Sequence, residues 1–219
     1  MTERALCVVA HPDDEALGCG ATLALHRKNG NAVMVVTMAD GVTSRDSIPE
    51  HTLDRRRRCL AALKILGITQ NAFGDWPDNK LDTVPMLYLA RDIEHAISVF
   101  KPTMIYTHHG GDLNIDHRIV HEAVRVACRP QPGNGVRQML FFEVPSSTEW
   151  GLSEFHPNYY VNIEETLETK IEALMAYGDE MRDWPHARSI EAVRHLAKWR
   201  GATVGLEAAE AFVVGRTIC

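Results

Sequence analysis

The sequence lacks the patterns that mark disulfide-stapled, secreted and membrane-spanning proteins. Its five cysteines include no Cys-x-x-Cys spacing, and an odd number of cysteines is a poor basis for a disulfide framework. No apolar run is long enough to span a bilayer, and the residues before the first apolar run do not form a signal-peptide pattern. We therefore expect a cytoplasmic protein with no membrane span.

An excess of positive charge and two common functional motifs are also missing. The 219 residues carry a formal net charge of −6, so we expect no nucleic-acid binding. The four arginines at 55–58 are expected on a solvated helix face, with one of them turned inward. Gly-x-Ser-x-Gly, which would mark a serine nucleophile, is absent. So is the Gly-x-Gly-x-x-Gly fingerprint, because Leu23 follows Gly18 and Gly20 where a third glycine would stand.

Continuous apolar runs alternate with helical patterns along the whole chain. Strands buried on both faces of a parallel sheet are continuously apolar. The patterns predict strands ending at residue 11 and covering 32–37, 104–107, 139–143, 159–161 and 211–214, with helices from 16, over 52–66 and 86–100, from 118, and over 164–177 and 188–198. We therefore predict an α/β fold with a Rossmann-like, doubly wound, mainly parallel sheet and helices on both faces, in one domain over residues 1–219.

Two finer expectations concern loops and one helix. Segments 38–44 and 73–79 are rich in polar and turn-forming residues, and we expect both as loops at the carboxyl edge of the sheet. In the helix over 52–66, four leucines are expected to form the buried stripe, namely Leu53, Leu60, Leu63 and Leu66.

The first apolar run ends in a dense cluster of metal-binding and acid–base groups. Pro12 cannot donate a ladder hydrogen bond, so the strand should stop at His11, and a helix should open near Ala16 with Asp13 or Asp14 as its cap. The imidazole and carboxylates then lie at the carboxyl end of a parallel strand, where open α/β sheets bind ligands. A cap or a strand-end hydrogen bond would explain any one of them, but three within four positions favour a functional site.

A second cluster follows the strand at 104–107 and should reach the same edge of the sheet. It contains three histidines and two aspartates, listed in chain order as His108, His109, Asp112, Asp116 and His117. A catalytic zinc takes three protein ligands and keeps a position for water. His11, one carboxylate of the Asp13/Asp14 pair and a histidine of this cluster would supply that set. The other carboxylate would then stand where a general base must be, and the two clusters predict hydrolysis of an amide or ester.

The segment Ala10-His11-Pro12-Asp13-Asp14-Glu15 resembles the signature of the PIG-L/LmbE-like N-deacetylases, which use zinc to remove N-acetyl groups from amino sugars. The resemblance implies His11 and Asp14 as metal ligands and Asp13 as the general base. It covers most of the chain and includes Arg55, Leu66-Gly67, Pro77-Asp78 and Arg200-Gly201.

The second motif of that family resembles the segment from Asn114 to Arg118, and its last histidine implies His117 as the third ligand. Here the chain departs from the family, which usually has a histidine at the position of Asn114. We expect Asn114 as a catalytic residue that donates a hydrogen bond to the oxyanion, although its amide cannot transfer a proton. Asp13 would then act as base and later as acid, unless His108 or His109 supplies the proton.

Substrate contacts are expected from four residues: Arg55, Asp78, Asp112 and His108. The first two match family positions, and Arg and Asp suit phosphate or sugar hydroxyls. Asp116 is expected to orient an imidazole or cap its helix, Asp112 or Glu143 to touch the substrate or support the metal ligands, and His186 and Arg188 to line the cleft. Ordinary caps and surface salt bridges are the alternative for all of these. His121, one helical turn after His117, could share its face, but a surface position is the simpler expectation.

These expectations combine into a hydrolase that holds one Zn²⁺, or another divalent metal, per chain. Its substrate would be a small acetylated amino sugar, nucleotide-linked or GlcNAc-like from a glycan pathway, and the chain could form a homo-oligomer. The alternative is a metal- or sugar-binding member of the same fold without catalysis, for which Asn114 is the supporting feature and Asp13 the opposing one.

Overall fold

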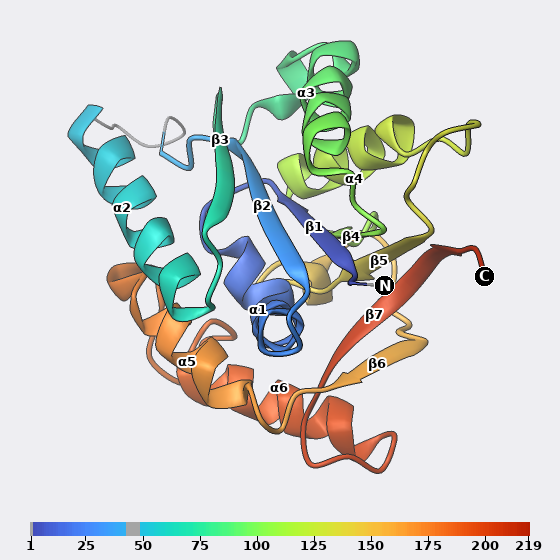
Figure 1. Cartoon of the computed structure of the whole chain (residues 1–219). Coiled ribbons are helices and arrows are strands. Elements are labelled where there is room, and N and C mark those ends of the chain that lie inside the picture. The colour runs from blue at the N-terminus through green and yellow to red at the C-terminus, as the bar shows by residue number, and fades with distance from the viewer. Residues whose placement is uncertain (1, 43–48) are drawn as a thin grey trace.

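The computed structural model describes residues 2–42 and 49–219, and a single seven-stranded sheet runs through it (Figure 1). The strands are β1 (Arg4–Val9), β2 (Ala32–Ala39), β3 (Gln70–Trp76), β4 (Met104–His108), β5 (Gln138–Phe142), β6 (Tyr159–Asn162) and β7 (Ala209–Thr217). Their order is β3-β2-β1-β4-β5-β7-β6; β1 to β5 are parallel, β7 is antiparallel to β5, and β6 is antiparallel to β7. The predicted doubly wound, mainly parallel α/β fold is confirmed.

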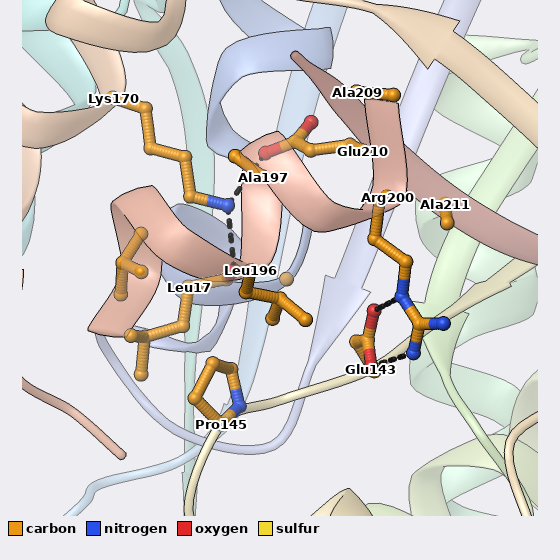
Figure 2. A pocket seen from close by; sticks show the side chains of 12 residues that line it. Leu17, Glu143, Pro145, Lys170, Leu196, Ala197, Arg200, Ala209, Glu210 and Ala211 are labelled. Carbon is orange, nitrogen blue, oxygen red and sulfur yellow. Dashed lines mark hydrogen bonds and ion pairs between the residues drawn. The ribbon is translucent and has the colours of Figure 1, made fainter. Parts of the chain in front are cut away.

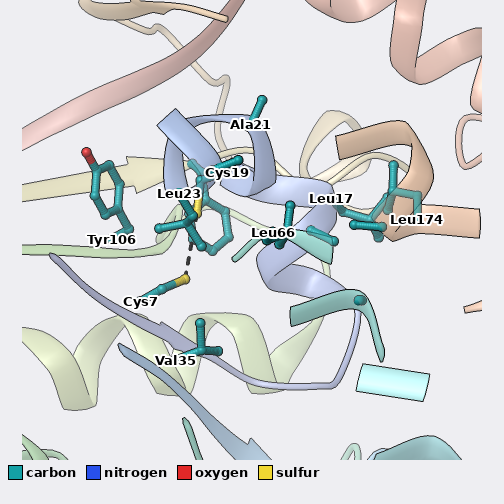
Figure 3. Close-up of a cluster of buried hydrophobic side chains, with 14 of the residues drawn as sticks. Cys7, Leu17, Cys19, Ala21, Leu23, Val35, Leu66, Tyr106 and Leu174 are labelled. Carbon is teal, nitrogen blue, oxygen red and sulfur yellow. Dashed lines mark hydrogen bonds between the residues drawn. The ribbon is translucent and has the colours of Figure 1, made fainter. Parts of the chain in front are cut away.

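Helices cover both faces of this sheet. They are α1 (Asp14–Lys28), α2 (Pro49–Ile65), α3 (Met86–Phe100), α4 (Ile115–Ala127), α5 (Leu167–Met175) and α6 (Ile190–Ala202). Figure 1 shows α3 and α4 on one side and α1, α5 and α6 on the other. Because side chains alternate along a strand, Cys7 and Val9 of β1 pack with the α1 side and Leu6 and Val8 with the α3 side. Figure 3 shows Cys7 facing Cys19 of α1 within the first of these two cores.

The expected loop at 73–79 is partly wrong, because β3 continues to Trp76. β3 is the edge strand, and its residues alternate between exposed and half-buried positions rather than forming an apolar run. Backbone pairing with β2 therefore makes it a strand despite its polar composition. β2 likewise extends to Ala39, past the predicted end at residue 37. Residues 43 and 44 of the other expected loop lie outside the described part of the chain.

The expected leucine stripe of α2 is also partly wrong. Leu63 and Leu66 are buried, but Leu53 is 62% exposed and Leu60 is 46% exposed. The buried stripe is completed by Cys59 and Ala62, which lie four residues before Leu63 and Leu66 respectively. Small residues thus face the core where the leucine pattern predicted large ones.

The helices at the carboxyl edge begin earlier than predicted. α1 starts at Asp14 instead of Ala16, and α4 starts at Ile115 instead of Arg118. Asp14 and His117 therefore belong to the first turns of two helices, which fixes both side chains relative to the sheet. Among the described helices, none is long and apolar enough to cross a membrane.

Candidate active site

Two imidazoles and one carboxylate converge at the carboxyl ends of β1 and β4. His11 Nδ1 and His117 Nε2 each lie 3.3 Å from Asp14 Oδ2, and all three residues are buried. Within the described part of the chain, Asp14 Oδ1 and His117 Nε2 form no hydrogen bond. Buried polar atoms without a partner are costly. Since His, His and Asp also form a donor set that suits a divalent cation, these three residues fit a metal centre.

The turn between β1 and α1 places Asp14 beneath His11. Asp13 adopts a left-handed backbone conformation with φ of 117°, and its side chain makes no capping hydrogen bond to α1. Asp14 Oδ2 instead accepts the His11 backbone N–H at 2.9 Å. The predicted capping role of these aspartates is therefore wrong, because the tight turn folds the Asp14 carboxylate back onto the strand end.

Each imidazole has a carboxylate on its other nitrogen. His11 Nε2 lies 3.0 Å from Asp116 Oδ2 and 3.0 Å from Asp78 Oδ1, and His117 Nδ1 lies 3.1 Å from Asp112 Oδ1. Such partners fix the orientation and tautomer of a metal-binding histidine. Burial alone would lower the pKa of His117, but Asp14 and Asp112 raise this pKa to about 9. Asp116 thus orients an imidazole, one of the two roles expected for it.

The two orienting aspartates are themselves held by several donors. Asp112 accepts the Ser147 hydroxyl, the Thr148 hydroxyl at 2.6 Å and the Asn114 backbone N–H at 2.8 Å. Burial alone would raise the pKa of Asp112, but hydrogen bonds from His117 and these hydroxyls lower this pKa to about 2. Asp116 accepts backbone N–H groups from the loop after β3, at 2.6 Å from Asn79 and 3.0 Å from Leu81.

Asp13 lies beside this donor set and faces two guanidinium groups. Its Oδ2 is 3.2 Å from Arg55 NH2 and 3.2 Å from Arg188 NH1. Arg55 is the inward-turned arginine of the 55–58 run, and it also pairs with Glu180. Burial raises the pKa of Asp13, and this effect outweighs the opposite effect of the two arginines. The expected approach of Arg188 from the distant tail of the chain is thus observed.

Asn114 is the N-cap of α4. Its Oδ1 accepts the Asp116 backbone N–H at 2.8 Å, and its Nδ2 donates to Asn79 Oδ1 at 3.2 Å. The side chain therefore contacts the loop after β3 and is half-buried rather than enclosed.

The remaining histidines lie behind or away from the donor set. His108 is fully buried, its ring stacks on His117 at 3.9 Å between centroids, and its Nε2 accepts the Ala10 N–H at 2.9 Å. The expected surface position of His121 is wrong. It lies one turn after His117 on the buried face of α4, and its Nδ1 donates to the His108 carbonyl at 2.9 Å. His109 packs its ring against Phe155.

Two further residues that were expected near the substrate have their contacts outside the donor set. Glu143 forms a two-pronged pair with Arg200, with Arg200 Nε at 2.8 Å and NH2 at 2.7 Å from its carboxylate oxygens. His186 Nδ1 accepts the backbone N–H of Arg188 at 3.0 Å, and His186 itself is exposed. Neither has a described contact with the donor set.

Sequence reasoning missed a further buried pair beneath Asp13. Glu15 accepts the Tyr177 hydroxyl and also the Asp13 backbone N–H, the latter at 3.1 Å. Burial raises the pKa of Glu15 to about 7. Glu15 was visible as part of the first cluster, but no local signal marks Tyr177, which lies 162 positions away.

A polar cavity of about 290 Å³ adjoins Arg55. Its charged lining is balanced, with three arginines (Arg55, Arg58 and Arg182) and three acids (Asp54, Asp179 and Glu180). A cavity that presents both donors and acceptors beside Asp13 suits a ligand with many hydroxyl groups.

Comparison with known families agrees with this geometry. The family model PIG-L, described as GlcNAc-PI de-N-acetylase, matches residues 6–128, a span that includes His11, Asp14 and His117. The chain belongs to the PIG-L family. The resemblance stated from its two motifs is thereby confirmed.

Two curated relatives are named as deacetylases. An uncharacterized deacetylase of Escherichia coli K12, YaiS, is 34% identical over 174 residues, which cover 77% of this chain and 87% of the relative. The 1D-myo-inositol 2-acetamido-2-deoxy-alpha-D-glucopyranoside deacetylase 1 of Saccharopolyspora erythraea is 25% identical, with coverage of 83% of this chain and 78% of the relative. The expected deacetylase class is thus confirmed by its PIG-L relatives.

Solved structures share the fold at lower identity. N,N'-diacetylchitobiose deacetylase from Pyrococcus horikoshii has a TM-score of 0.78 at 21% identity and covers 98% of this chain and 84% of its own. The 4-carboxy-2-hydroxymuconate hydratase GalB from Pseudomonas putida KT2440 has a TM-score of 0.78 at 22% identity, with coverage of 100% and 98%. Since one of these two proteins is a hydratase, the reaction has to be argued from the site rather than from the fold.

Proposed function

We propose that this PIG-L protein is a zinc-dependent hydrolase that removes the N-acetyl group from an amino sugar. The observation that carries the proposal is the convergence of His11 Nδ1, His117 Nε2 and the Asp14 carboxylate, with a fourth acid–base group, Asp13, beside them but outside the set. A zinc ion in this donor set would polarise the amide carbonyl and make a water molecule more acidic, which is the chemistry that amide hydrolysis needs.

Asp13 is assigned as the general base. Its carboxylate is buried and carries two guanidinium partners, Arg55 and Arg188, which hold it in one position. From there it would accept the proton of the attacking water and later deliver it to the leaving amine nitrogen. Asn114 would donate its amide N–H to the developing oxyanion after exchanging its contact with Asn79.

The sugar is assigned to the polar cavity beside Arg55 and to Asp78. Both side chains border the donor set, Arg55 through Asp13 and Asp78 through His11. Asp112 and His108, the other two residues expected at the substrate, are fully buried and contact His117. We therefore assign them to holding the ligand set. The named substrate of the Saccharopolyspora relative, an acetamido-deoxy-glucopyranoside, supports an acetylated amino sugar here.

Acetate release from a panel of N-acetylated amino sugars, free, glycosidic and nucleotide-linked, tests the proposal. The metal-loaded protein should release acetate, a chelator should abolish the release, and added Zn²⁺ should restore it. Activity that survives complete removal of the metal would overturn the proposal.

Asn114 favours one alternative, a protein that binds metal and sugar without catalysis. Its amide already caps α4 and contacts Asn79. Stoichiometric zinc binding with no turnover of any amide in the panel would support this alternative. The placement of Asp13 opposes it, since a site for binding metal alone does not need a second carboxylate held by two arginines.

A further inference from the structure

Helix α1, which begins with Asp14, is interrupted one turn after its start. Cys19 has φ of −147° and ψ of 22°, so it is not helical, although it lies within the span Asp14–Lys28. The segment before the interruption contains only about one helical turn. A single turn does not hold its own conformation, because helix nucleation is unfavourable. Other groups must therefore fix the turn that carries Asp14.

A buried ion pair from distant parts of the chain fills this interruption. Lys170 Nζ of α5 donates to the Leu17 carbonyl at 2.8 Å and to Glu210 Oε1 of β7 at 2.6 Å. The Glu210 carboxylate accepts the backbone N–H of Ala21 at 3.1 Å and of Thr22 at 2.7 Å. Figure 2 shows the Lys170 ammonium between the Glu210 carboxylate and the backbone of α1.

The pair takes the place of one hydrogen bond of the helix. In an uninterrupted α-helix the Ala21 N–H would donate to the Leu17 carbonyl. Here Glu210 accepts the Ala21 N–H and Lys170 donates to the Leu17 carbonyl, so the pair supplies a partner to both groups. The residue at 170 has to donate to a carbonyl, and the residue at 210 has to accept from N–H groups. Exchanging the lysine and the glutamate would therefore leave these backbone groups without partners.

The interruption lets the first turn lie close to the sheet beneath the donor set. A Cβ on Gly18 would lie 2.3 Å from the Phe142 ring, so only glycine fits at this approach. The Phe142 and His108 rings form a T-shaped contact with 5.0 Å between centroids, and His108 stacks on His117. The position of the turn is thus coupled by direct contacts to a metal-binding imidazole as well as to Asp14.

Stability alone does not explain an ion pair at this place. Lys170 and Glu210 are each 5% exposed. Replacing a buried ion pair with apolar side chains of similar size is often neutral or stabilising, because the desolvation penalty disappears. What apolar side chains cannot do is to bind a free carbonyl and two free N–H groups in the middle of a helix.

We propose that Lys170 and Glu210 are positioning residues, which hold α1 open after its first turn and thereby set the place of the Asp14 carboxylate in the metal centre. This inference rests on the proposed function for its effect on turnover, but its effect on the metal centre is measured independently. Removal of the pair allows the Ala21 to Leu17 hydrogen bond to form, the first turn rotates, and Asp14 leaves its position against His11 and His117.

The double variant Lys170→Met/Glu210→Met tests this inference, since it leaves no unpaired buried charge. Zn²⁺ has a full d shell, so the geometry of the ligands is read from the visible absorption of the Co²⁺-loaded protein. We expect shifted Co²⁺ bands and a loss of about 10- to 100-fold in zinc affinity, measured by competition with a chromophoric chelator. kcat should fall while KM changes little.

Glu210→Gln is the second variant. Its amide oxygen still accepts one backbone N–H and contacts Lys170, but its NH2 group cannot accept the other backbone N–H, and Lys170 loses its buried counter-charge. We expect a less stable folded protein that shows a change of the same kind. The control is Arg194→Gln/Glu168→Gln, which breaks an exposed ion pair between α6 and α5 that does not touch α1. It should leave the Co²⁺ spectrum and the zinc affinity unchanged.

Wild-type Co²⁺ spectra and zinc affinity in both Lys170/Glu210 variants would overturn the inference, whatever their melting temperatures. If the double variant does not fold, the spectrum and affinity of Glu210→Gln decide the question. If the wild-type protein releases no acetate, the proposed function is contradicted. The comparison of Co²⁺ spectra and zinc affinity between the wild type and the variants still tests this inference.

Discussion

The His11 imidazole and the Asp116 carboxylate lie 3.0 Å apart, Nε2 to Oδ2, although 105 positions separate them in the chain. β1 ends at Val9, two residues before His11 and earlier than the predicted end at residue 11, and Asp116 lies in the first turn of α4, which follows the neighbouring strand β4. Asp116 also accepts two backbone N–H groups from the loop after β3. One carboxylate thus ties three carboxyl-edge loops to the orientation of the imidazole that we propose as a metal ligand.

Asp116→Asn should weaken metal binding without removing a ligand. The amide keeps one acceptor oxygen for the loop after β3 but no longer offers a negative charge to His11. Loss of such a partner costs about 10- to 100-fold in metal affinity or activity. Zinc competition titrations measure this loss. Asp82→Asn, at an exposed position, is the control and should titrate like the wild type.

The two adjacent aspartates should respond differently to the same substitution. Asp14→Asn should lose zinc and activity together, because the donor set loses its one carboxylate. Asp13→Asn should keep stoichiometric zinc and lose about 10²- to 10⁴-fold in kcat, the usual scale for a positioned proton transfer. Metal analysis and acetate release on the same samples give both results. Zinc lost from Asp13→Asn but retained by Asp14→Asn would show that the two assignments are reversed.

Serine at position 114 separates capping from catalysis. Asn114→Ser keeps an N-cap oxygen, so the free energy of unfolding should stay within a few tenths of a kcal/mol of the wild type, whereas Asn114→Ala should lose about 1 kcal/mol. If the amide serves the oxyanion, both variants should lose about 10²- to 10³-fold in kcat. Denaturant unfolding and steady-state kinetics measure the two effects. An unchanged kcat in Asn114→Ser would restrict Asn114 to its capping role.

Gly18→Ala should destabilise the fold, because its Cβ would lie 2.3 Å from the Phe142 ring. Overpacking of this kind costs about 1–3 kcal/mol. Urea unfolding measures the loss. Gly135→Ala provides the matched control, since its Cβ would meet its nearest neighbour, the Pro102 carbonyl, at an ordinary 3.6 Å. A Gly18→Ala protein as stable as the wild type would mean that α1 can move away from the sheet without cost.

The chain by itself determines the fold class and the chemistry of the site. Continuous apolar runs such as Leu6–Ala10 specify strands buried on both faces, and their alternation with helical patterns specifies a parallel sheet. Because parallel strands bring their carboxyl ends to one edge, the His-Pro-Asp-Asp segment and the segment ending at His117 were expected at the same edge, and the neighbouring positions of β1 and β4 bring them together. Each of these patterns depends only on residues that are close in the sequence, so it can be recognised without the structure.

Only the tertiary structure decides which groups serve the donor set as partners. Four pairs join residues more than 35 positions apart: Asp116 with His11, Arg188 with Asp13, Tyr177 with Glu15, and Lys170 with Glu210, the last of which contacts α1. Neither hydrophobic periodicity nor a helix-capping motif in the sequence predicts such pairs. They follow from the order of the strands and the packing of α1, α4 and α5, which place particular side chains within hydrogen-bond distance of one another. The same packing buries His121 and exposes Leu53, because the burial of a residue depends on which other elements pack against it.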